Sequence, residues 1–169
     1  MNKRITNTPE RDTFRLITHN MKEYQYVKVD QELLYKIPLE MEGKSGISLV
    51  NESLNNFKFK KIFPWNLTVR LNYKEMDING LPTDNQLFLI ENYRKILENK
   101  FNSEDKPNVL FVANICVNGE SDLIWRVHNP DIIEEVLKRE IQVKPIKFEF
   151  GYFMKYDIEW MEVEALINL

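Results

Sequence analysis

The chain has 169 residues, of which 43% are hydrophobic and 29% charged, with a formal net charge of -3 and a mean hydropathy of -0.43. This composition is enough for one ordinary core, and no apolar run is long enough to predict a membrane span. The acidic balance disfavours a dedicated nucleic-acid binder, which needs a strongly basic surface to replace phosphate counterions.

The opening residues predict a cytoplasmic protein. Residues 1–12 are polar and lack the apolar centre of a signal peptide, and Cys116 is the single cysteine, so an internal disulfide is excluded. We expect a flexible tail at 1–12, a β-rich extension at 13–62 that packs on the same core, and a main α+β domain at 63–169. Together they form a single domain.

Within the extension, residues 13–29 have the β-branched and aromatic content of strands. From Asp30 a helical turn could start, but Pro38 limits its length. A turn is predicted at 43–46 and a short strand at 47–50. The basic cluster at 58–61 alternates with apolar residues, which favours the solvated edge of a half-buried strand over a phosphate-binding patch.

The main domain begins with a strand at 66–73, where apolar and polar residues alternate with a period of two. After a turn-rich loop, Thr83 is placed to cap a helix that runs to Phe101, with Gln86 three residues on as in a capping box. Residues 107–117 are apolar on both faces and predict a buried strand.

Asn118-Gly119 is a strong hairpin signal, and an alternating strand follows at 122–128. Asn129 then caps a second helix, with Pro130 at its first position. A last strand is expected at 145–156 and a short amphipathic segment at 159–169. The order strand, helix, strand, strand, helix, strand predicts a ferredoxin-like βαββαβ antiparallel sheet with two helices on one face.

No specific catalytic, metal or nucleotide signature occurs in the sequence. The histidines are only His19 and His128, the glycines do not follow a phosphate-loop spacing, and Cys116 lies among apolar neighbours as a buried structural thiol does. We therefore predict neither a metal nor a cofactor. Asp157 and Glu159 could act as paired carboxylates, or they could be solvated acids at a strand end.

The sheet face opposite the helices is predicted to be polar, because six polar side chains alternate with the apolar series: Arg70, Asn72, Arg126, His128, Lys147 and Glu149. Either this face binds a polar or anionic ligand, or the extension covers part of it with salt bridges. In the first case Arg70 and Arg126 would hold an anion, and Glu149 or His128 would carry a proton. The same face lacks the exposed aromatics with which RNA-recognition sheets stack bases.

The chain from about residue 45 onward resembles an uncharacterised bacterial family, domain of unknown function 695. The resemblance covers roughly residues 45–165 and rests on ISLVNESLNN, PWNLTVRLNY, GLPTDNQ with Glu91 in the following helix, NGESDLIWRVHN and YDIEW. The family ending usually carries a proline where this chain has Ile158. The family has no established activity, but some members are fused to a domain like the bacterial inhibitor of ribonuclease E, which implies a protein-binding regulatory role by analogy.

We therefore expect a non-enzymatic protein-binding or regulatory module. The alternatives are a small anionic-ligand binder or enzyme that uses the polar face, and an immunity-type inhibitor of a toxin. Trp160, Val163 and Ile167 form an apolar stripe that must bury itself on the chain's own sheet or on a partner. The strand 107–117 is expected at a sheet edge, where either a homodimer or the N-terminal strands would cover it.

Overall fold

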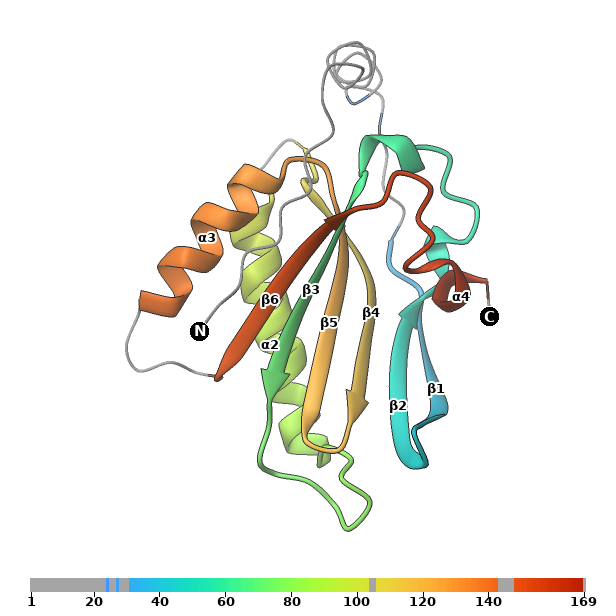
Figure 1. Ribbon diagram of the computed structural model, residues 1–169, viewed down its shortest axis with the longest axis vertical. Coiled ribbons are helices and arrows are strands. Elements are labelled where there is room, and N and C mark those ends of the chain that lie inside the picture. Colours follow the sequence, from blue (N-terminus) through green and yellow to red (C-terminus); the bar gives the residue numbers. More distant parts are fainter. Residues whose placement is uncertain (1–23, 25–26, 28–30, 104–105, 143–147, 169) are drawn as a thin grey trace.

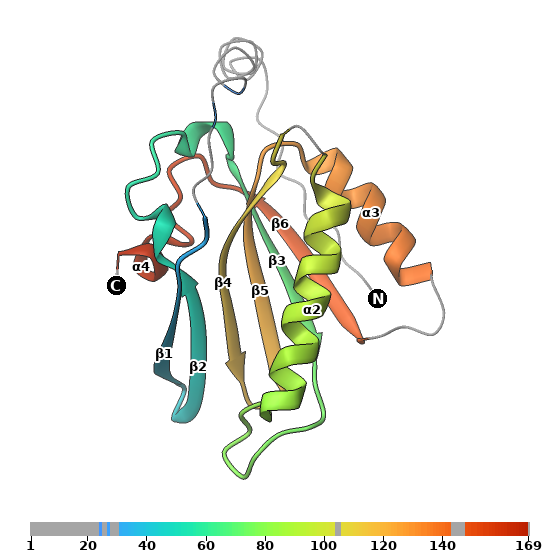
Figure 2. The ribbon, with the colours of Figure 1, turned by 180° about the vertical axis from the view of Figure 1, so that it is seen from behind.

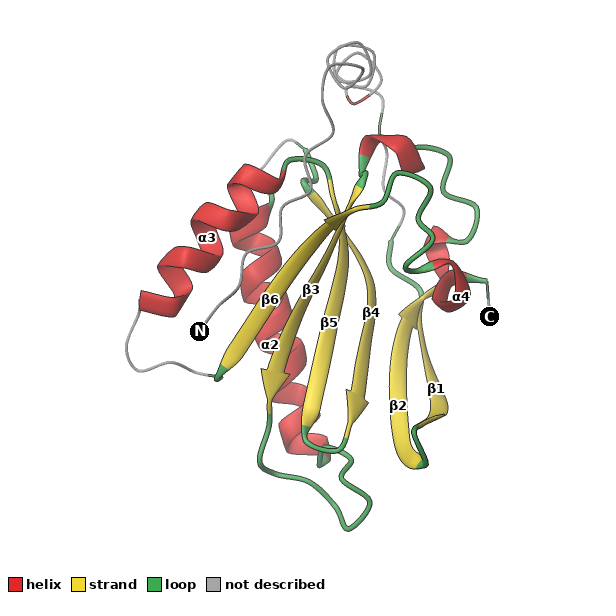
Figure 3. Cartoon of the chain, in the orientation of Figure 1, coloured by secondary structure: helices red, strands yellow, loops and turns green. Residues whose placement is uncertain are grey.

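The computed structural model describes Tyr24, Val27 and residues 31–103, 106–142 and 148–168. The predicted tail at 1–12 and, except for Tyr24 and Val27, the strand-like region 13–29 lie outside these residues. The described chain forms a mixed α+β structure around a six-stranded antiparallel sheet. Figure 3 shows the strands side by side in one layer, with the longer helices behind them.

The strands occur in the spatial order β1-β2-β4-β5-β3-β6. Their bounds are β1 Leu34–Met41, β2 Lys44–Asn51, β3 Trp65–Asn72, β4 Val109–Val117, β5 Glu120–Val127 and β6 Phe150–Tyr156. The α+β class and the antiparallel sheet are as predicted. The sheet has more strands than the predicted βαββαβ arrangement, because β1 and β2 join it beyond β4.

Helices α2 (Asp84–Phe101) and α3 (Pro130–Gln142) cover one face of the sheet, as Figures 1 and 2 show from opposite sides. The short helix α4 (Glu164–Ile167) lies against β2 and β4 on the other face. Two 3₁₀ turns, Glu52–Leu54 and Lys60–Ile62, connect β2 to β3. None of the helices in the described part of the chain has the length and apolarity to cross a bilayer.

The start of α2 confirms one half of the predicted capping box. The Thr83 side chain accepts a hydrogen bond from the Gln86 N–H at 3.2 Å, so the helix begins where the sequence predicts. The reciprocal bond is absent, because the Gln86 side chain accepts from the Glu75 N–H at 3.4 Å and the Thr83 N–H donates to the Glu75 carbonyl. Gln86 thus ties the loop 74–82 to the helix.

Each face of the sheet has its own buried core. On the helix side, Leu67, Val69 and Leu71 of β3 pack with residues of α2 and α3, so the strand alternation predicted the correct inner face. On the other side a second core contains Phe63, Val112, Ile124, Trp160 and Val163. This second core covers part of the face that the sequence predicts to be polar, while Arg70 on the same face is exposed.

The strand 107–117 is not at a sheet edge, and that expectation is wrong. β2 pairs with β4 over Gly46–Val50, so β4 has a neighbour on each side, and its apolar residues are buried on both faces. The hairpin β1–β2 therefore covers the edge of β4 within one chain. The reason for expecting a dimer along this strand no longer applies.

Three local predictions also differ. The expected helical turn after Asp30 is absent from the described residues, because 34–41 pairs as a strand with β2 around a two-residue turn at Glu42-Gly43. Residues 57–62 form turns and a 3₁₀ segment instead of a strand edge, since no neighbouring strand pairs with them. The last strand begins at Phe150, five residues after the predicted start at Pro145. Residues 145–147 of the predicted strand lie outside the described residues.

Candidate functional site

A cavity of about 250 Å³ opens at one end of the sheet, between the β2–β3 connection and the turn after β6. We call it the lysine pocket, and it is lined by residues 57–62, Ile158 and Glu159. Three of these residues are the lysines of the basic cluster, Lys58, Lys60 and Lys61. The pocket therefore combines aromatic walls with positive charge on a chain whose net charge is negative.

The first wall of the pocket is formed by residues 57–62, and its path begins at the end of β2. The Asn51 side chain accepts hydrogen bonds from the Ser53 N–H and the Leu33 N–H, each at 3.2 Å, and donates to the Phe111 carbonyl at 2.9 Å. These bonds end the strand and start the 3₁₀ turn at Glu52. The chain then crosses the sheet face, anchored by the buried side chains of Leu54, Ile62 and Phe63.

Under the pocket lies the Arg126 cluster, which we define as Arg126, Asp157, Trp160 and the Phe63 carbonyl. The Arg126 guanidinium is fully buried, and it donates to Asp157 Oδ2 at 2.9 Å and to the Phe63 carbonyl at 3.2 and 3.3 Å. It also donates to the Asp157 carbonyl and lies 4.9 Å from the centre of the Trp160 ring. This cation is held entirely by groups of its own chain.

The Asp157 carboxylate also forms the turn that carries the second wall. Its two oxygens accept from the N–H groups of Met161 and Glu162, both at 3.0 Å, and the Trp160 N–H donates to the Asp157 carbonyl at 3.2 Å. A tight turn therefore forms although Ile158 replaces the family's proline. Asp157 and Glu159 are not a carboxylate pair, because Asp157 is hydrogen-bonded through both oxygens and Glu159 is exposed.

Trp160 adopts a positive φ of 62°, which is uncommon for a bulky side chain and is strained unless the surroundings enforce it. Its indole N–H donates to the carbonyls of Lys60 and Phe63 at 2.9 and 3.0 Å, and its ring stacks with Phe57. The Lys60 ammonium lies 5.5 Å from the centre of the same ring. Trp160 thus joins the two walls of the pocket.

Burial lowers the pKa of Arg126 to about 10, although the Asp157 carboxylate acts in the opposite direction. The guanidinium is charged at neutral pH and neutralises Asp157 inside the fold. The Arg126 charge is therefore balanced within its own cluster.

His128 supports the pocket from the side of β5. Its Nδ1 lies 2.7 Å from the Ile62 carbonyl, and its ring stacks on Tyr24 with a centroid distance of 4.0 Å. The Tyr24 hydroxyl in turn donates to the Pro107 carbonyl at 2.8 Å. His128 is thus tied to the 3₁₀ segment that forms the first wall.

The structure brings three predicted site residues, Arg126, His128 and Trp160, to this end of the sheet. Arg70 is elsewhere, because the register β3 to β5 places it opposite Asp122, roughly 13 Å along the strands from the position of Arg126 at about 3.3 Å per residue. Its guanidinium makes two 2.7 Å bonds to that carboxylate. Glu149 is exposed beyond the start of β6, and Lys147 lies outside the described residues.

The predicted partner stripe of Trp160, Val163 and Ile167 is buried against its own sheet, in the core that residues 52–64 and 157–167 build over β4 and β5. Of the two ways to bury the stripe that the sequence leaves open, the structure has the intramolecular one. The predicted polar face is therefore covered at the Arg126 end by these segments, and Val27 and Val50 belong to the same core.

A second buried arginine, Arg94 of α2, lies on the helix side of the sheet. Its guanidinium contacts three carboxylates at 2.7–3.2 Å, those of Glu32, Glu91 and Glu98. We call these four residues the Arg94 cluster. The guanidinium also stacks over Phe111 at 3.9 Å, and Glu98 accepts from the Trp125 indole at 2.8 Å. This cluster is not among the predicted sites, although acids three residues before and four residues after an arginine on a helix are a readable signal.

Replacing Glu98 by glutamine is expected to change how stability depends on pH. Burial raises the pKa of Glu98, with Arg94 acting against the shift, so between the unfolded pKa near 4.5 and the higher folded value the native state binds more protons. The contribution of Glu98 to stability therefore falls as pH rises through that window. Urea unfolding from pH 4.5 to 7 should show this slope in the native chain and a weaker one in Glu98→Gln, whereas equal slopes would contradict the assignment.

Among the residues that the structure describes, no group of three or more His, Cys, Asp or Glu side chains is placed to hold a metal ion. Residues 37–163 match the model of a family described as "Family of unknown function (DUF695)". No curated protein matches the chain, and no solved structure does. The matched range includes both walls of the lysine pocket and both buried arginines.

Proposed function

The chain belongs to the DUF695 family, whose description assigns no activity, and from its own geometry we propose that it is a non-enzymatic protein-binding module. Its partner is a protein that presents an acidic segment with apolar neighbours to the lysine pocket. The observation that carries this proposal is the coincidence of three lysines with aromatic walls around one cavity of about 250 Å³.

Charge supports an acidic partner. Lys58 and Lys61 are exposed and Lys60 is half-buried, and the three line the pocket with the apolar side chains of Phe57 and Phe59 and one carboxylate, that of Glu159. A carboxylate accepts charge-assisted hydrogen bonds from ammonium groups, and an adjacent apolar side chain buries area on the rings. Positive charge at one place on an acidic protein also steers an acidic segment toward that place.

Preorganisation supports binding at this site. The Arg126 cluster joins the two walls through bonds to the Phe63 carbonyl and the Lys60 carbonyl, so the walls hold their shape without a partner. A rigid site loses less conformational entropy on association than a mobile one. The same contacts argue for binding over catalysis, because Asp157 is committed to Arg126 and to backbone amides.

The order β4-β5-β3-β6, with α2 and α3 on one face, supports the further proposal that residues 63–156 form a ferredoxin-like unit to which β1 and β2 are added. In this reading the lysine pocket lies where the connection from the added strands crosses the sheet. The location of the protein in the cytoplasm is part of the same proposal.

Peptide display tests the proposed function. A random peptide library selected on the native chain should yield sequences with Asp or Glu beside aromatic or aliphatic residues. In a fluorescence anisotropy titration, Lys58→Glu combined with Lys60→Glu should weaken binding of such a peptide by about tenfold or more, roughly 1.4 kcal/mol. Lys95→Glu, an exposed charge reversal on α2, is the matched control and should leave binding unchanged.

Two results would overturn the proposal. Selected peptides without acidic residues would show that charge does not govern recognition, and equal binding to the double variant would show that the site is elsewhere. Binding of free acetate or phosphate as tightly as the peptide would instead indicate a site for small anions.

A further inference from the structure

The loop 74–82 lies at the end of the molecule opposite the lysine pocket. The loop follows the end of β3, whereas the pocket residues 57–62 come just before its start. The two sites are thus separated by the length of an eight-residue strand, roughly 26 Å at about 3.3 Å per residue. Figures 1 and 2 show the loop at the lower tip of the molecule and the β2–β3 connection in the upper half. A chain's own loop therefore lies too far from its own pocket to enter it.

Hydrogen bonds fix the shape of this loop. The Asp77 N–H donates to the Leu81 carbonyl at 2.8 Å, and Asp77 Oδ1 accepts from the N–H groups of Asn79 and Leu81 at 2.8 and 2.9 Å. The Gly80 carbonyl accepts from the Tyr73 hydroxyl at 2.7 Å. Gly80 itself has a φ of 79°, which glycine adopts without strain. The loop therefore holds its shape without a partner.

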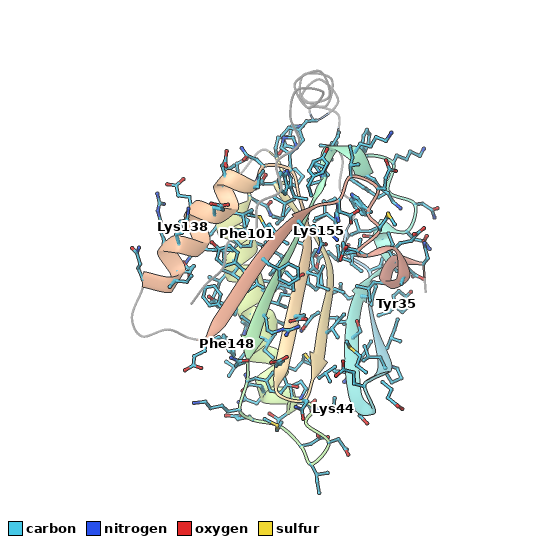
Figure 4. All side chains as sticks on the ribbon, in the orientation of Figure 1. Tyr35, Lys44, Phe101, Lys138, Phe148 and Lys155 are labelled. Carbon is cyan, nitrogen blue, oxygen red and sulfur yellow. The ribbon has the colours of Figure 1, made fainter. Side chains whose placement is uncertain are left out.

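The tip of this loop presents an apolar side chain. Ile78 is 100% exposed, more than any other large hydrophobic residue that the structure describes, and Met76 is 43% exposed. Burial of Ile78 in a partner would remove its whole side chain from water. Because the loop is already ordered, such a contact costs little conformational entropy. Figure 4 shows the side chains of this loop pointing away from the rest of the molecule, with the labelled Lys155 toward the other end.

The charges around Ile78 are the reverse of those around the lysine pocket. Residues 74–84 contain one lysine and three carboxylates, at Lys74, Glu75, Asp77 and Asp84. The pocket is lined by three lysines and one carboxylate, that of Glu159. In the described part of the chain, Glu75 and Asp77 accept their hydrogen bonds from uncharged amide groups. The loop and the pocket are therefore complementary in charge, and each combines that charge with apolar side chains.

We propose that the loop 74–82 of one copy binds in the lysine pocket of a second copy, so that copies of this chain associate head to tail. Ile78 packs on the rings of Phe57 and Phe59, since a cavity of about 250 Å³ has room for one aliphatic side chain. Glu75 and Asp77 bond to the pocket lysines. This inference rests on the proposed function, because the loop is an acidic segment with apolar neighbours, and it goes further by naming the partner.

A contact of this kind is heterologous, since it joins two different surfaces. Each pair of copies keeps one unused loop and one unused pocket, so assembly continues beyond the dimer unless the copies close into a ring. The charged part of the contact is screened by salt. In light scattering, the mean mass of the native chain should therefore rise with concentration from the monomer mass of 20.3 kDa, and should rise less at high salt.

Complementary variants test the contact directly. Ile78→Ser removes the apolar side chain from the loop, and Lys58→Glu combined with Lys60→Glu reverses charge in the pocket. Each should lower the association constant by about tenfold or more, so that its mass stays near that of the monomer. An equimolar mixture of the two should form a heterodimer of twice that mass and grow no further, because the first variant keeps only its pocket and the second only its loop.

Ile132→Ser, which removes an exposed apolar side chain from α3, is the matched control and should leave the mass curve of the native chain unchanged. Circular dichroism should show the native fold for every variant. A native chain that stays monomeric at hundreds of micromolar would overturn the inference, and so would a mixture of the two variants that stays monomeric. If the native chain is monomeric but binds selected acidic peptides at the lysine pocket, the inference fails and the proposed function stands.

Discussion

Replacing Arg126 by methionine is expected to lower the free energy of unfolding by about 3–5 kcal/mol, as when one partner of a buried ion pair is removed. Methionine keeps much of the side-chain volume but leaves the Asp157 carboxylate without its cation. The Phe63 carbonyl also loses two donors, and Trp160 loses its cation–π contact. A domain of this size has a total stability of about 5–15 kcal/mol, so the variant should be close to unfolding at 37 °C.

Urea unfolding followed by far-UV circular dichroism measures this loss. Arg70→Met is a matched control on the same face of the sheet, since Arg70 also pairs with a carboxylate but its side chain is 51% exposed. Its expected loss is about 0–1 kcal/mol. Equal losses at the two positions would contradict the view that burial determines the effect. In the double variant Arg126→Met with Asp157→Asn, the loss should be smaller than the sum of the two single losses.

Replacing Arg94 by methionine is the second large effect, with an expected loss of about 3–5 kcal/mol at pH 7. The substitution leaves Glu32, Glu91 and Glu98 near one another without a cation, and the Phe111 ring loses the guanidinium that covers it. Glu98 is the most affected of the three, since burial already raises its pKa. In the native chain the Arg94–Glu32 ion pair links the segment before β1 to α2. We therefore expect the amide hydrogens of this segment to exchange faster in the variant.

The loss should depend on pH in a definite direction. Without the cation that opposes the shift, the Glu98 carboxyl binds its proton more tightly in the folded chain than in the unfolded chain, so the variant regains stability as pH falls from 7 toward 4.5. The difference between native chain and variant should therefore shrink on acidification. Arg139→Met, which removes an exposed pair with Glu135 on α3, should show a small loss at both pH values. A loss at Arg94 that is independent of pH would show that packing, not charge, causes it.

The candidate site could be predicted from the sequence only in part. Arg126, His128 and Trp160 attract notice as polar or aromatic residues in otherwise regular patterns. His128 and Trp160 contact residues that line the lysine pocket, and Arg126 contacts Trp160. The lysines themselves were assigned to a strand edge, because alternation of Lys and Phe over 57–62 has the period of a strand. This local pattern does not indicate whether another strand pairs with residues 57–62.

The parts of the fold that depend on local pattern and capping could be predicted from the amino-acid sequence. The period of two in β3 and β5, the Thr83 cap of α2 and the Asn118-Gly119 hairpin all follow from residues near one another in the chain. These features respond to short-range sterics and hydrogen bonds, which the neighbouring residues largely decide.

The neighbour of β4 and the cover of the face opposite the helices depend instead on contacts between distant parts of the chain. The β2–β4 pair joins residues 46–50 to 113–117, and the Arg94–Glu32 pair joins positions 62 apart. Whether such groups meet depends on how the whole chain packs, and the free energy of each contact depends on the burial that packing creates. The same guanidinium group is therefore an exposed surface partner at Arg70 and a buried structural cation at Arg126.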